Sequence, residues 1–177
     1  MSHGFDIKMD GKFTRKTRFV ANGNETVDLP KHDCYASVVS RESVRIAFLY
    51  AALNDLDILS CDITNAYLNA PCLEKLWYAA GPEFGSDKGS VMLIRKAVYG
   101  LKSAGNSWHS TISNTLINLG YKPTRADPDV YQRQARRAGG EIYNEWLLCY
   151  VDDLLVISTD RNGRWIRSVK HTTYEIP

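Results

Sequence analysis

The sequence lacks the features that mark several common protein classes. Its four cysteines are scattered without a C-x-x-C pair, and its four histidines show no metal-ligand spacing. These absences argue against a disulfide framework and a zinc knuckle, and such cysteine usage is typical of a reducing compartment. We find no signal peptide, no apolar run long enough to span a bilayer, no internal repeat and no low-complexity tract. We therefore expect a soluble, intracellular protein.

The residues that are present suffice for one folded domain. The 177 residues are 44% hydrophobic and 24% charged, with a formal net charge of +2. This composition permits a real core and gives no strong bias towards a partner. Basic residues cluster between Lys8 and Arg18 and again between Arg133 and Arg137. Such clusters are either a solvated face or a surface for an acidic partner.

Hydrophobic periodicity predicts a mixture of helices and strands. Ser40 is a plausible N-cap for a helix whose apolar residues fill several faces, which predicts a largely buried helix. A second helix follows the loop at 99–108, carries Trp108 on its core face and stops at Gly120. The mixture predicts the α+β class with a largely antiparallel sheet. Strands are expected at 13–20, 56–63, 76–80, 91–95 and from about 130, with hairpins at 135–145 and 146–158.

Two adjacent aspartates interrupt the most apolar part of the sequence. Asp152 and Asp153 stand in CYVDDLLVIS, at the predicted tip of a hairpin. Aspartate is a common turn residue, so a solvated turn is one explanation. The apolar flanks LLCYV and LLVIS favour the centre of a sheet instead, where an ionised carboxylate needs a partner or a metal.

A third carboxylate in a similar setting favours the metal. Asp62 ends the apolar strand in LSCDITNAYLNA, and the aromatic Tyr67 follows in a short loop. Three carboxylates from two adjacent strand ends can hold two Mg²⁺ ions, which take oxygen ligands. Ions held in this way activate an attacking hydroxyl and stabilise the leaving oxygen in phosphoryl transfer.

These blocks resemble the reverse transcriptases of copia-type retrotransposons. YVDD is preceded by DITNAYLNA and by AVYGLKSAGNSW, in the family's order, and KTRFVANGNET, YASVVSRESVRIAF and GYKPTRADPDVY extend the likeness from about Asp6 to Ser158. The resemblance implies a right-hand polymerase fold, with a mainly antiparallel palm sheet packed on helices. It also implies an RNA-directed DNA polymerase that carries out two-metal nucleotidyl transfer to a primer 3′-hydroxyl.

The resemblance further implies a division into fingers and palm within residues 1–158. The fingers parts are expected at about 1–40 and 70–105, and the palm parts at about 41–69 and 106–158. Residues 159–177 are expected to be a divergent tail of a C-terminally truncated chain. The expected partners are an RNA template, a DNA primer, deoxynucleoside triphosphates and the missing thumb and ribonuclease H segments of the polyprotein. No membrane is expected, and the expected location is the cytoplasm or virus-like particles.

Single residues acquire roles through the same resemblance. Asp62, Asp152 and Asp153 match the catalytic aspartates that hold two Mg²⁺ ions, for which Mn²⁺ can substitute, with Asp62 and Asp152 the more essential. Tyr67 matches the aromatic residue that rejects a 2′-hydroxyl. The implied nucleotide-binding residues are Lys16, Arg18, Asn65, Ala66 and Tyr67. The implied template- and primer-binding residues are Tyr99, Gly100, Lys102, Tyr150 and Val151.

Simpler explanations stay open at this point. Tyr67 could be core packing, Lys16 and Arg18 a solvated strand face, and YGLKSAG an ordinary loop before a helix. Gly105 stands where many relatives have proline. For the whole chain, one alternative is a catalytically inactive, truncated retrotransposon remnant that keeps the fold or only binds nucleic acid. Another is a phosphate-handling enzyme that reached a carboxylate cluster by convergence.

Overall fold

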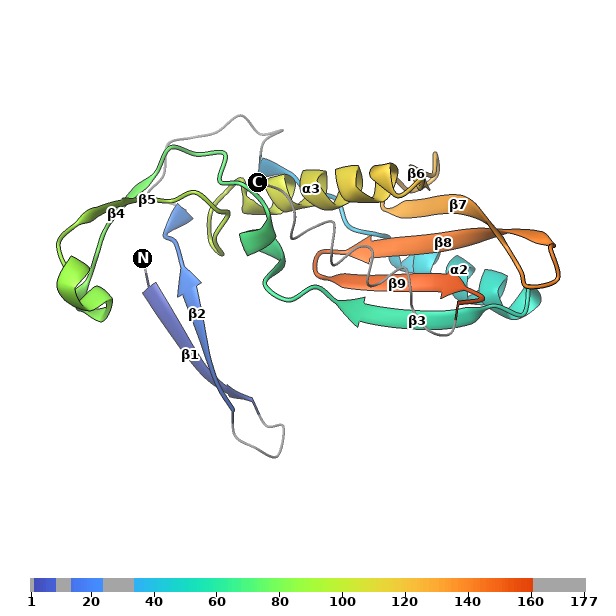
Figure 1. The fold of residues 1–177 in the computed structure, drawn as a ribbon, viewed down its shortest axis with the longest axis horizontal. Coiled ribbons are helices and arrows are strands. Elements are labelled where there is room, and N and C mark those ends of the chain that lie inside the picture. The colour runs from blue at the N-terminus through green and yellow to red at the C-terminus, as the bar shows by residue number, and fades with distance from the viewer. Residues whose placement is uncertain (1, 9–13, 24–33, 161–177) are drawn as a thin grey trace. The chain divides into compact units, whose positions relative to one another are not determined.

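The computed structural model of the chain describes residues 2–8, 14–23 and 34–160 (Figure 1). It combines helices with antiparallel strands, so the predicted α+β class is confirmed. Within these three ranges, no helix is long and apolar enough to cross a membrane. All but the first two residues of the predicted tail lie outside the described residues.

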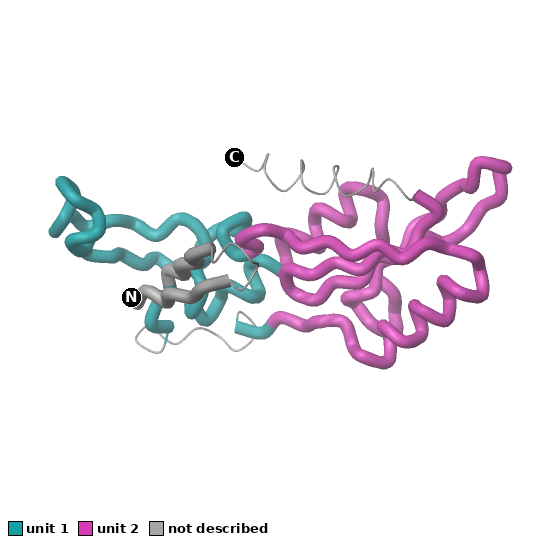
Figure 2. The backbone as a smooth tube through the Cα atoms, turned by 90° about the horizontal axis from the view of Figure 1, so that it is seen from below, with its two compact units in different colours: residues 1–35, 67–108 teal, residues 36–66, 109–177 magenta. Residues whose placement is uncertain are grey.

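The chain divides into two compact units that alternate along the sequence (Figure 2). Unit 1 comprises residues 1–35 and 67–108, and unit 2 comprises residues 36–66 and 109–177. The predicted fingers and palm parts follow one another in the same order.

Unit 2 is built around a five-stranded antiparallel sheet with the order β3-β9-β8-β7-β6. The central strand β8 buries Leu147 and Leu148, which point to opposite faces, so both faces of the sheet are covered. The strands are β3 (Asp57–Asp62), β6 (Lys122–Pro123), β7 (Val130–Arg136), β8 (Ile142–Tyr150) and β9 (Asp153–Ser158). The predicted strands and both hairpins of this region are confirmed.

Helix α2 (Arg41–Leu53) begins where the sequence predicts but is less buried than expected. The Ser40 hydroxyl caps it by accepting a hydrogen bond from the Ser43 N–H at 3.1 Å. Only Ala47 and Ala51 are buried, so the prediction of a largely buried helix is wrong. Their small side chains let the helix approach the sheet along a narrow stripe, and the larger apolar residues beside this stripe stay in solvent. These are Ile46, Phe48, Leu49 and Leu53.

The buried stripe of α2 packs on the face of the sheet that carries Leu148 and Ile157. Tyr50 stacks on Trp146 with ring centroids 4.4 Å apart and donates a hydrogen bond to the Asn144 carbonyl at 2.9 Å. Each large apolar side chain buried there contributes about 1.5–3 kcal/mol relative to exposure. This packing fixes α2 on the sheet.

Helix α3 (Ala104–Asn118) has the core face that the sequence predicts. Trp108, Ile112 and Leu116 are all buried. The helix ends at Asn118, and Gly120 two residues later terminates it with a φ of 86°, which is accessible to glycine at little cost. The Tyr121 N–H then donates to the Leu116 carbonyl at 3.0 Å. The residues after this glycine therefore return directly towards β7.

Unit 1 contains two small antiparallel ribbons. One pairs β1 (Ser2–Lys8) with β2 (Thr14–Val20), and the other pairs β4 (Trp77–Ala79) with β5 (Val91–Leu93). A 3₁₀ segment, Pro82–Asp87, connects β4 and β5. The predicted strands of unit 1 are thus present, although each strand of the second ribbon is only three residues long.

Candidate active site

The predicted hairpin tip is a two-residue loop between β8 and β9. Tyr150 and Asp153 are Cα partners across the hairpin, and Val151 and Asp152 form the loop. Val151 has a φ of 54°, in the left-handed region that β-branched residues avoid. Such a conformation costs on the order of 1–3 kcal/mol and persists only where the surroundings enforce it. The loop is therefore held in a defined, strained geometry.

Two carboxylates face each other across the neighbouring strand pair. Asp62, the last residue of β3, is the Cα partner of Asp153, the first residue of β9. The Ile63 N–H donates to the Asp152 carbonyl at 2.8 Å, which marks the Asp62–Asp153 pair as a non-hydrogen-bonded one. In such pairs the Cα atoms lie about 4.5 Å apart and the side chains share one face. Both side chains are exposed, so two negative charges meet at one point on the surface.

The sequence predicts that Asp62, Asp152 and Asp153 form one cluster, and the register of β3 on β9 adds which residues lie opposite one another. The residue directly opposite Asp62 is Asp153, whereas Asp152 lies in the loop and gives its backbone carbonyl to Ile63. Like charges directly opposite one another destabilise a sheet. Exposed carboxylate oxygens are the kind of donor that Mg²⁺ and Mn²⁺ prefer. Within the described part of the chain, no three acidic, histidine or cysteine side chains gather closely enough to hold a metal ion.

An apolar hollow of about 270 Å³ lies beside the carboxylate pair. Phe48 of α2 and Leu155 of β9 contribute to its wall, and Ser60, Tyr150 and Asp153 add its polar groups. The side chain of Tyr150 is itself 55% exposed. Apolar walls reduce the local dielectric constant and so strengthen the attraction between a carboxylate and a cation.

The strand that leads into the hairpin is held by two backbone hydrogen bonds at Cys149. The Cys149 N–H donates to the Asp129 carbonyl at 3.0 Å, and its carbonyl accepts from the Val39 N–H at 3.0 Å. Asp129 is 1% exposed, and its carboxylate bonds His109 Nε2 at 2.6 Å. Its second oxygen, Oδ2, has no hydrogen-bond partner among the residues described. Asp129 thus connects α3 to the strand that carries the hairpin.

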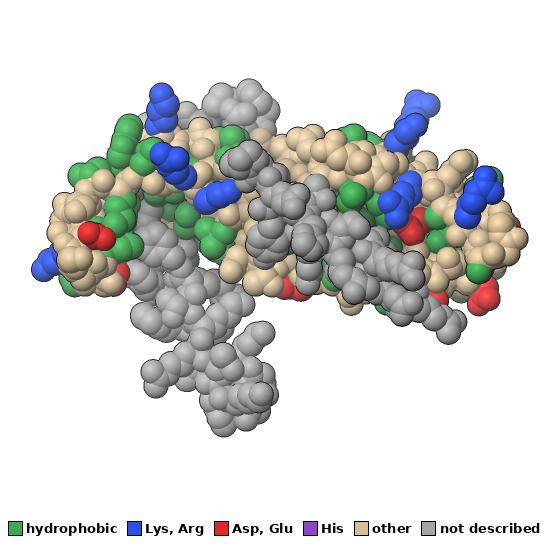
Figure 3. Space-filling view, in the orientation of Figure 1, with side chains coloured by type: hydrophobic (Ala, Val, Ile, Leu, Met, Phe, Trp, Pro, Cys, Tyr) green, Lys and Arg blue, Asp and Glu red, His purple; other side chains and the backbone are tan. Residues whose placement is uncertain are grey.

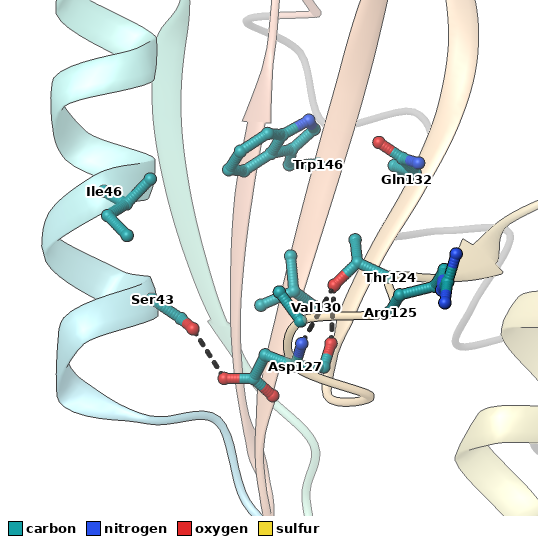
Figure 4. Close-up of a pocket in the computed structure, with 9 residues that line it drawn as sticks. Ser43, Ile46, Thr124, Arg125, Asp127, Val130, Gln132 and Trp146 are labelled. Carbon is teal, nitrogen blue, oxygen red and sulfur yellow. Dashed lines mark hydrogen bonds between the residues drawn. The ribbon is translucent and has the colours of Figure 1, made fainter.

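Asp127 joins the same loop to the start of α2. Its Oδ2 accepts hydrogen bonds from the Ser43 hydroxyl at 2.6 Å and the Ser40 N–H at 3.0 Å, at the edge of a pocket of about 480 Å³ (Figure 4). Burial alone would raise the pKa of Asp127, but these bonds and one from the Asp129 N–H hold it below its ordinary value. The ionised carboxylate therefore stabilises the helix N-terminus.

The His109–Asp129 contact predicts a pH-dependent stability. The hydrogen bond that His109 donates to the Asp129 carboxylate raises the pKa of His109 above its ordinary 6.5, against the opposing effect of burial. The folded state therefore favours the proton, and this stabilisation is complete below about pH 6.5 and disappears as the pH rises through the raised value. Urea unfolding of the wild type should show this loss, and His109→Gln should flatten it. Equal pH slopes in both proteins would contradict the assignment.

The structure brings Tyr67 and Tyr99 together within unit 1. Tyr67 lies in a 3₁₀ segment, Ala66–Asn69, and its ring centroid is 4.8 Å from that of Tyr99 at an interplanar angle of 54°. Both rings are partly exposed. In unit 2, Asn65 has a φ of 54° and Ala66 is buried, so the chain turns sharply before Tyr67.

Gly100 lets its own backbone segment approach another segment of the same chain closely. It has a φ of 89°, and an added Cβ would lie 2.1 Å from the Ala21 carbonyl oxygen. Lys102 is partly exposed two residues later. Lys16 and Arg18 belong to β2, opposite Asp6 and Gly4, but their side chains lie outside the described residues.

Sequence analysis missed three buried acids. Glu74 is 8% exposed and accepts hydrogen bonds from the Ser103 N–H at 3.2 Å and hydroxyl at 2.8 Å, at the start of α3. Glu145 and Asp129 are likewise buried. Glu74 and Asp129 lie outside the strands, and an acid in a strand such as Glu145 normally indicates the solvent face, so no local pattern marked these residues as buried.

The fold and the paired carboxylates define an α+β protein with an acidic hairpin tip at one end of an antiparallel sheet. A family model described as reverse transcriptase (RNA-dependent DNA polymerase) matches residues 3–174. The chain belongs to this family, and the predicted relationship to copia-type retrotransposons is confirmed. The match extends past Ser158, where the quoted sequence blocks end.

Two plant proteins illustrate the relationship. The retrovirus-related Pol polyprotein from transposon RE1 of Arabidopsis thaliana is 30% identical over 155 residues, covering 85% of this chain and 10% of that protein. The corresponding polyprotein from transposon TNT 1-94 of Nicotiana tabacum is 30% identical over 163 residues, covering 89% and 12%. The chain therefore spans about a tenth of the length of these curated relatives. No solved structure matches the chain significantly.

Proposed function

We propose that the chain is an RNA-directed DNA polymerase domain of a retrotransposon, with unit 1 as fingers and unit 2 as palm. The observation that carries this proposal is the non-hydrogen-bonded pair of Asp62 and Asp153 beside the strained hairpin loop. Two exposed like charges directly opposite one another do not stabilise the fold, so the pair is best explained by a cationic ligand. The family supplies the matching chemistry.

In this proposal the chain's residues position a primer 3′-hydroxyl and a deoxynucleoside triphosphate. Asp62, Asp152 and Asp153 would hold divalent metal through their oxygens. When bound, Mg²⁺ supplies an activated hydroxyl and compensates charge on the leaving phosphate oxygen. Asp129 and Val39 keep the strand before the loop in place, which matters because a displacement of about 1 Å can cost on the order of 100-fold in rate.

Primer extension by the full chain tests this function. Residues 1–177 are incubated with a DNA primer on an RNA template, deoxynucleoside triphosphates and Mg²⁺ or Mn²⁺, and product length is read on a gel. We expect template-dependent extension that is lost in Asp152→Asn and retained in Asp57→Asn. Asp57 is a matched control because it lies at the opposite end of β3, paired with Ser158.

The same assay addresses the alternative of a non-catalytic remnant. That alternative predicts no extension by the wild type, together with template–primer binding that is unaffected by Asp152→Asn. Extension that persists in Asp152→Asn would instead contradict the assigned metal ligands.

Sugar selection is proposed to depend on Tyr67. Its ring, held against Tyr99, would occupy the space that a 2′-hydroxyl needs. Tyr67→Val should raise ribonucleotide use relative to deoxynucleotide use by about 10- to 200-fold, the range for one pocket contact. Competition assays with paired nucleotides measure this ratio, and Tyr67→Phe, which keeps the ring, should behave like the wild type. If Tyr67→Val left the ratio of ribonucleotide to deoxynucleotide use unchanged, Tyr67 would only contribute to packing.

A further inference from the structure

One face of the sheet in unit 2 is only partly covered by helix α2. The helix contacts β3 and β9, and its buried stripe packs on Leu148 and Ile157. Cα pairing links one residue of each strand from β9 to β6 into a row of side chains on this face, namely Ile157, Trp146, Gln132 and Lys122. Gln132 and Lys122, at the end of the row away from α2, are exposed. The part of the face on β7 and β6 is therefore open.

A groove of about 480 Å³ lies between α2 and this open part of the sheet. Ile46 of α2 lines one side and Arg125 lines the other, with Val130 and Trp146 of the sheet between them (Figure 4). All the residues that line the groove belong to unit 2. The groove is thus a feature of one compact unit.

An apolar stripe of α2 continues the groove along the helix. Ile46, Leu49 and Leu53 follow one another at helical spacing and are 57%, 59% and 76% exposed. The seven residues from the first to the last of them span about 10 Å. A small ligand would contact the groove alone, whereas a helix laid along α2 would cover the groove and the stripe together.

The width of the open face matches one helix. Neighbouring strands lie about 4.8 Å apart, so β8 and β6 are separated by about 10 Å. Packed helices lie about 8–10 Å from one another. A second helix placed beside α2 would therefore cover β7 and β6 and bury Ile46, Leu49 and Trp146.

The charge around the groove indicates an acidic partner. Arg125 and Lys122 are exposed, and neither forms an ion pair with an acidic side chain within residues 2–8, 14–23 and 34–160. Basic side chains also stand over β6 and β7 in the view of Figure 3. The acids nearby are already engaged: Asp127 accepts the hydrogen bonds at the start of α2, and Glu42 lies 3.8 Å from Arg41.

We propose that this groove binds an acidic amphipathic helix of a partner protein. The helix lies beside α2, over β7 and β6. Its apolar residues contact Ile46, Leu49 and Trp146, and its acidic flank pairs with Lys122 and Arg125. The groove shares no lining residue with the carboxylate pair, so this inference does not rest on the proposed polymerase function.

Two other occupants fit the groove less well. Residues 161–177 of the chain have the wrong charge, because they carry Arg161, Arg164, Arg167 and Lys170 against the single acid Glu175. Nucleic acid binds through many phosphate contacts, whereas the groove offers two cations beside an apolar floor.

Binding of a labelled helical peptide to residues 1–177, followed by fluorescence anisotropy, tests the apolar contact. The peptide has about 15 residues, close to the length of α2, with leucine at every third or fourth position and glutamate along one flank. We expect saturable binding that the double variant Ile46→Ser, Leu49→Ser weakens by at least about 10-fold, the value of burying one large apolar side chain. Ile117→Ser, which changes an exposed apolar residue of α3, is the matched control and should have no effect.

Charge reversal tests the acidic flank. The double variant Lys122→Glu, Arg125→Glu should bind the glutamate peptide about 10-fold more weakly than the wild type does. The same variant should bind a matched peptide with lysine in place of glutamate more tightly than the wild type does, because complementary charge determines the choice of partner. Reversing the exposed Lys88 and Lys96 of unit 1 in the same way should leave both affinities unchanged.

The proposal fails if the wild type does not bind the glutamate peptide, if the serine variant binds it as the wild type does, or if charge reversal leaves the preference between the two peptides unchanged. Sedimentation that shows self-association of the wild type, lost in the serine variant, would make the groove a contact between copies of this chain. Equal competition by an oligothymidylate would make it a general anion surface, and either result would overturn the proposal. Asp152→Asn should bind the peptide normally, so loss of polymerase activity and loss of this site are distinguishable.

Discussion

Asp62→Asn is expected to abolish primer extension and at the same time to make the metal-free protein slightly more stable. Activity should fall by at least about 100-fold, because charge stabilisation by bound metal is worth several kcal/mol. Stability should rise by less than about 1 kcal/mol, because the variant removes one of two like charges at a non-hydrogen-bonded pair. Opposite changes in activity and stability are typical of a residue retained for function.

Extension assays and urea unfolding without divalent metal measure the two effects. Asp57→Asn, on the same strand, should leave extension intact and bring no gain in stability. A loss of stability in Asp62→Asn would mean that Asp62 contributes to folding, and the argument from the charged pair would then fail.

Glu145→Ala is expected to cause the largest loss of stability in unit 2. Glu145 is 3% exposed and is bonded by Arg133 Nε at 2.9 Å, by the Ser158 hydroxyl at 2.6 Å and by the Tyr121 hydroxyl. Burial and then the adjacent Glu145 raise the pKa of Tyr121, so its hydroxyl keeps the proton that it donates. Removing the carboxylate leaves the Arg133 cation without its counter-ion and the buried Tyr121 hydroxyl without its acceptor, which costs about 3–5 kcal/mol.

A surface pair in the turn of the same hairpin provides the control. Glu141 approaches Arg137 at 3.2 Å but is 73% exposed, so Glu141→Ala should cost less than about 1 kcal/mol. Replacing Glu145 and Arg133 together with methionine should recover much of the loss, because no buried charge is then left alone. Comparable losses in Glu145→Ala and Glu141→Ala, measured by urea unfolding, would show that the network is unimportant.

Local patterns carried most of the information about secondary structure. Ser40 and Gly120 marked the start of α2 and the end of α3 because capping and left-handed φ are local properties of the chain. The burial of α2 could not be predicted in this way. Apolar residues on several faces show what a helix could bury, whereas the sheet covers only the stripe of Ala47 and Ala51.

The sequence predicts which carboxylates belong to the site, but not how they are arranged relative to one another. Apolar flanks identified Asp62, Asp152 and Asp153, yet which of the last two faces Asp62 depends on the register of β3 and β9. That register joins two segments about 90 residues apart and is set by tertiary packing. The loop before β9, with Val151 at positive φ, decides that β9 begins at Asp153, and a β-branched residue gives no signal for such a loop. The burial of Asp129 and Glu145 depends on tertiary packing, which local sequence patterns do not reveal.

Binding of Mn²⁺ at the carboxylate pair tests the central proposal most directly. The electron paramagnetic resonance signal of free Mn²⁺ is recorded with residues 1–177, an RNA template and a DNA primer ending in a dideoxynucleotide, and a deoxynucleoside triphosphate. The account predicts that the wild type and Asp57→Asn remove the same excess of Mn²⁺ over the nucleotide alone, and that the double variant Asp62→Asn, Asp153→Asn removes none. Equal uptake by the double variant and the wild type would contradict it.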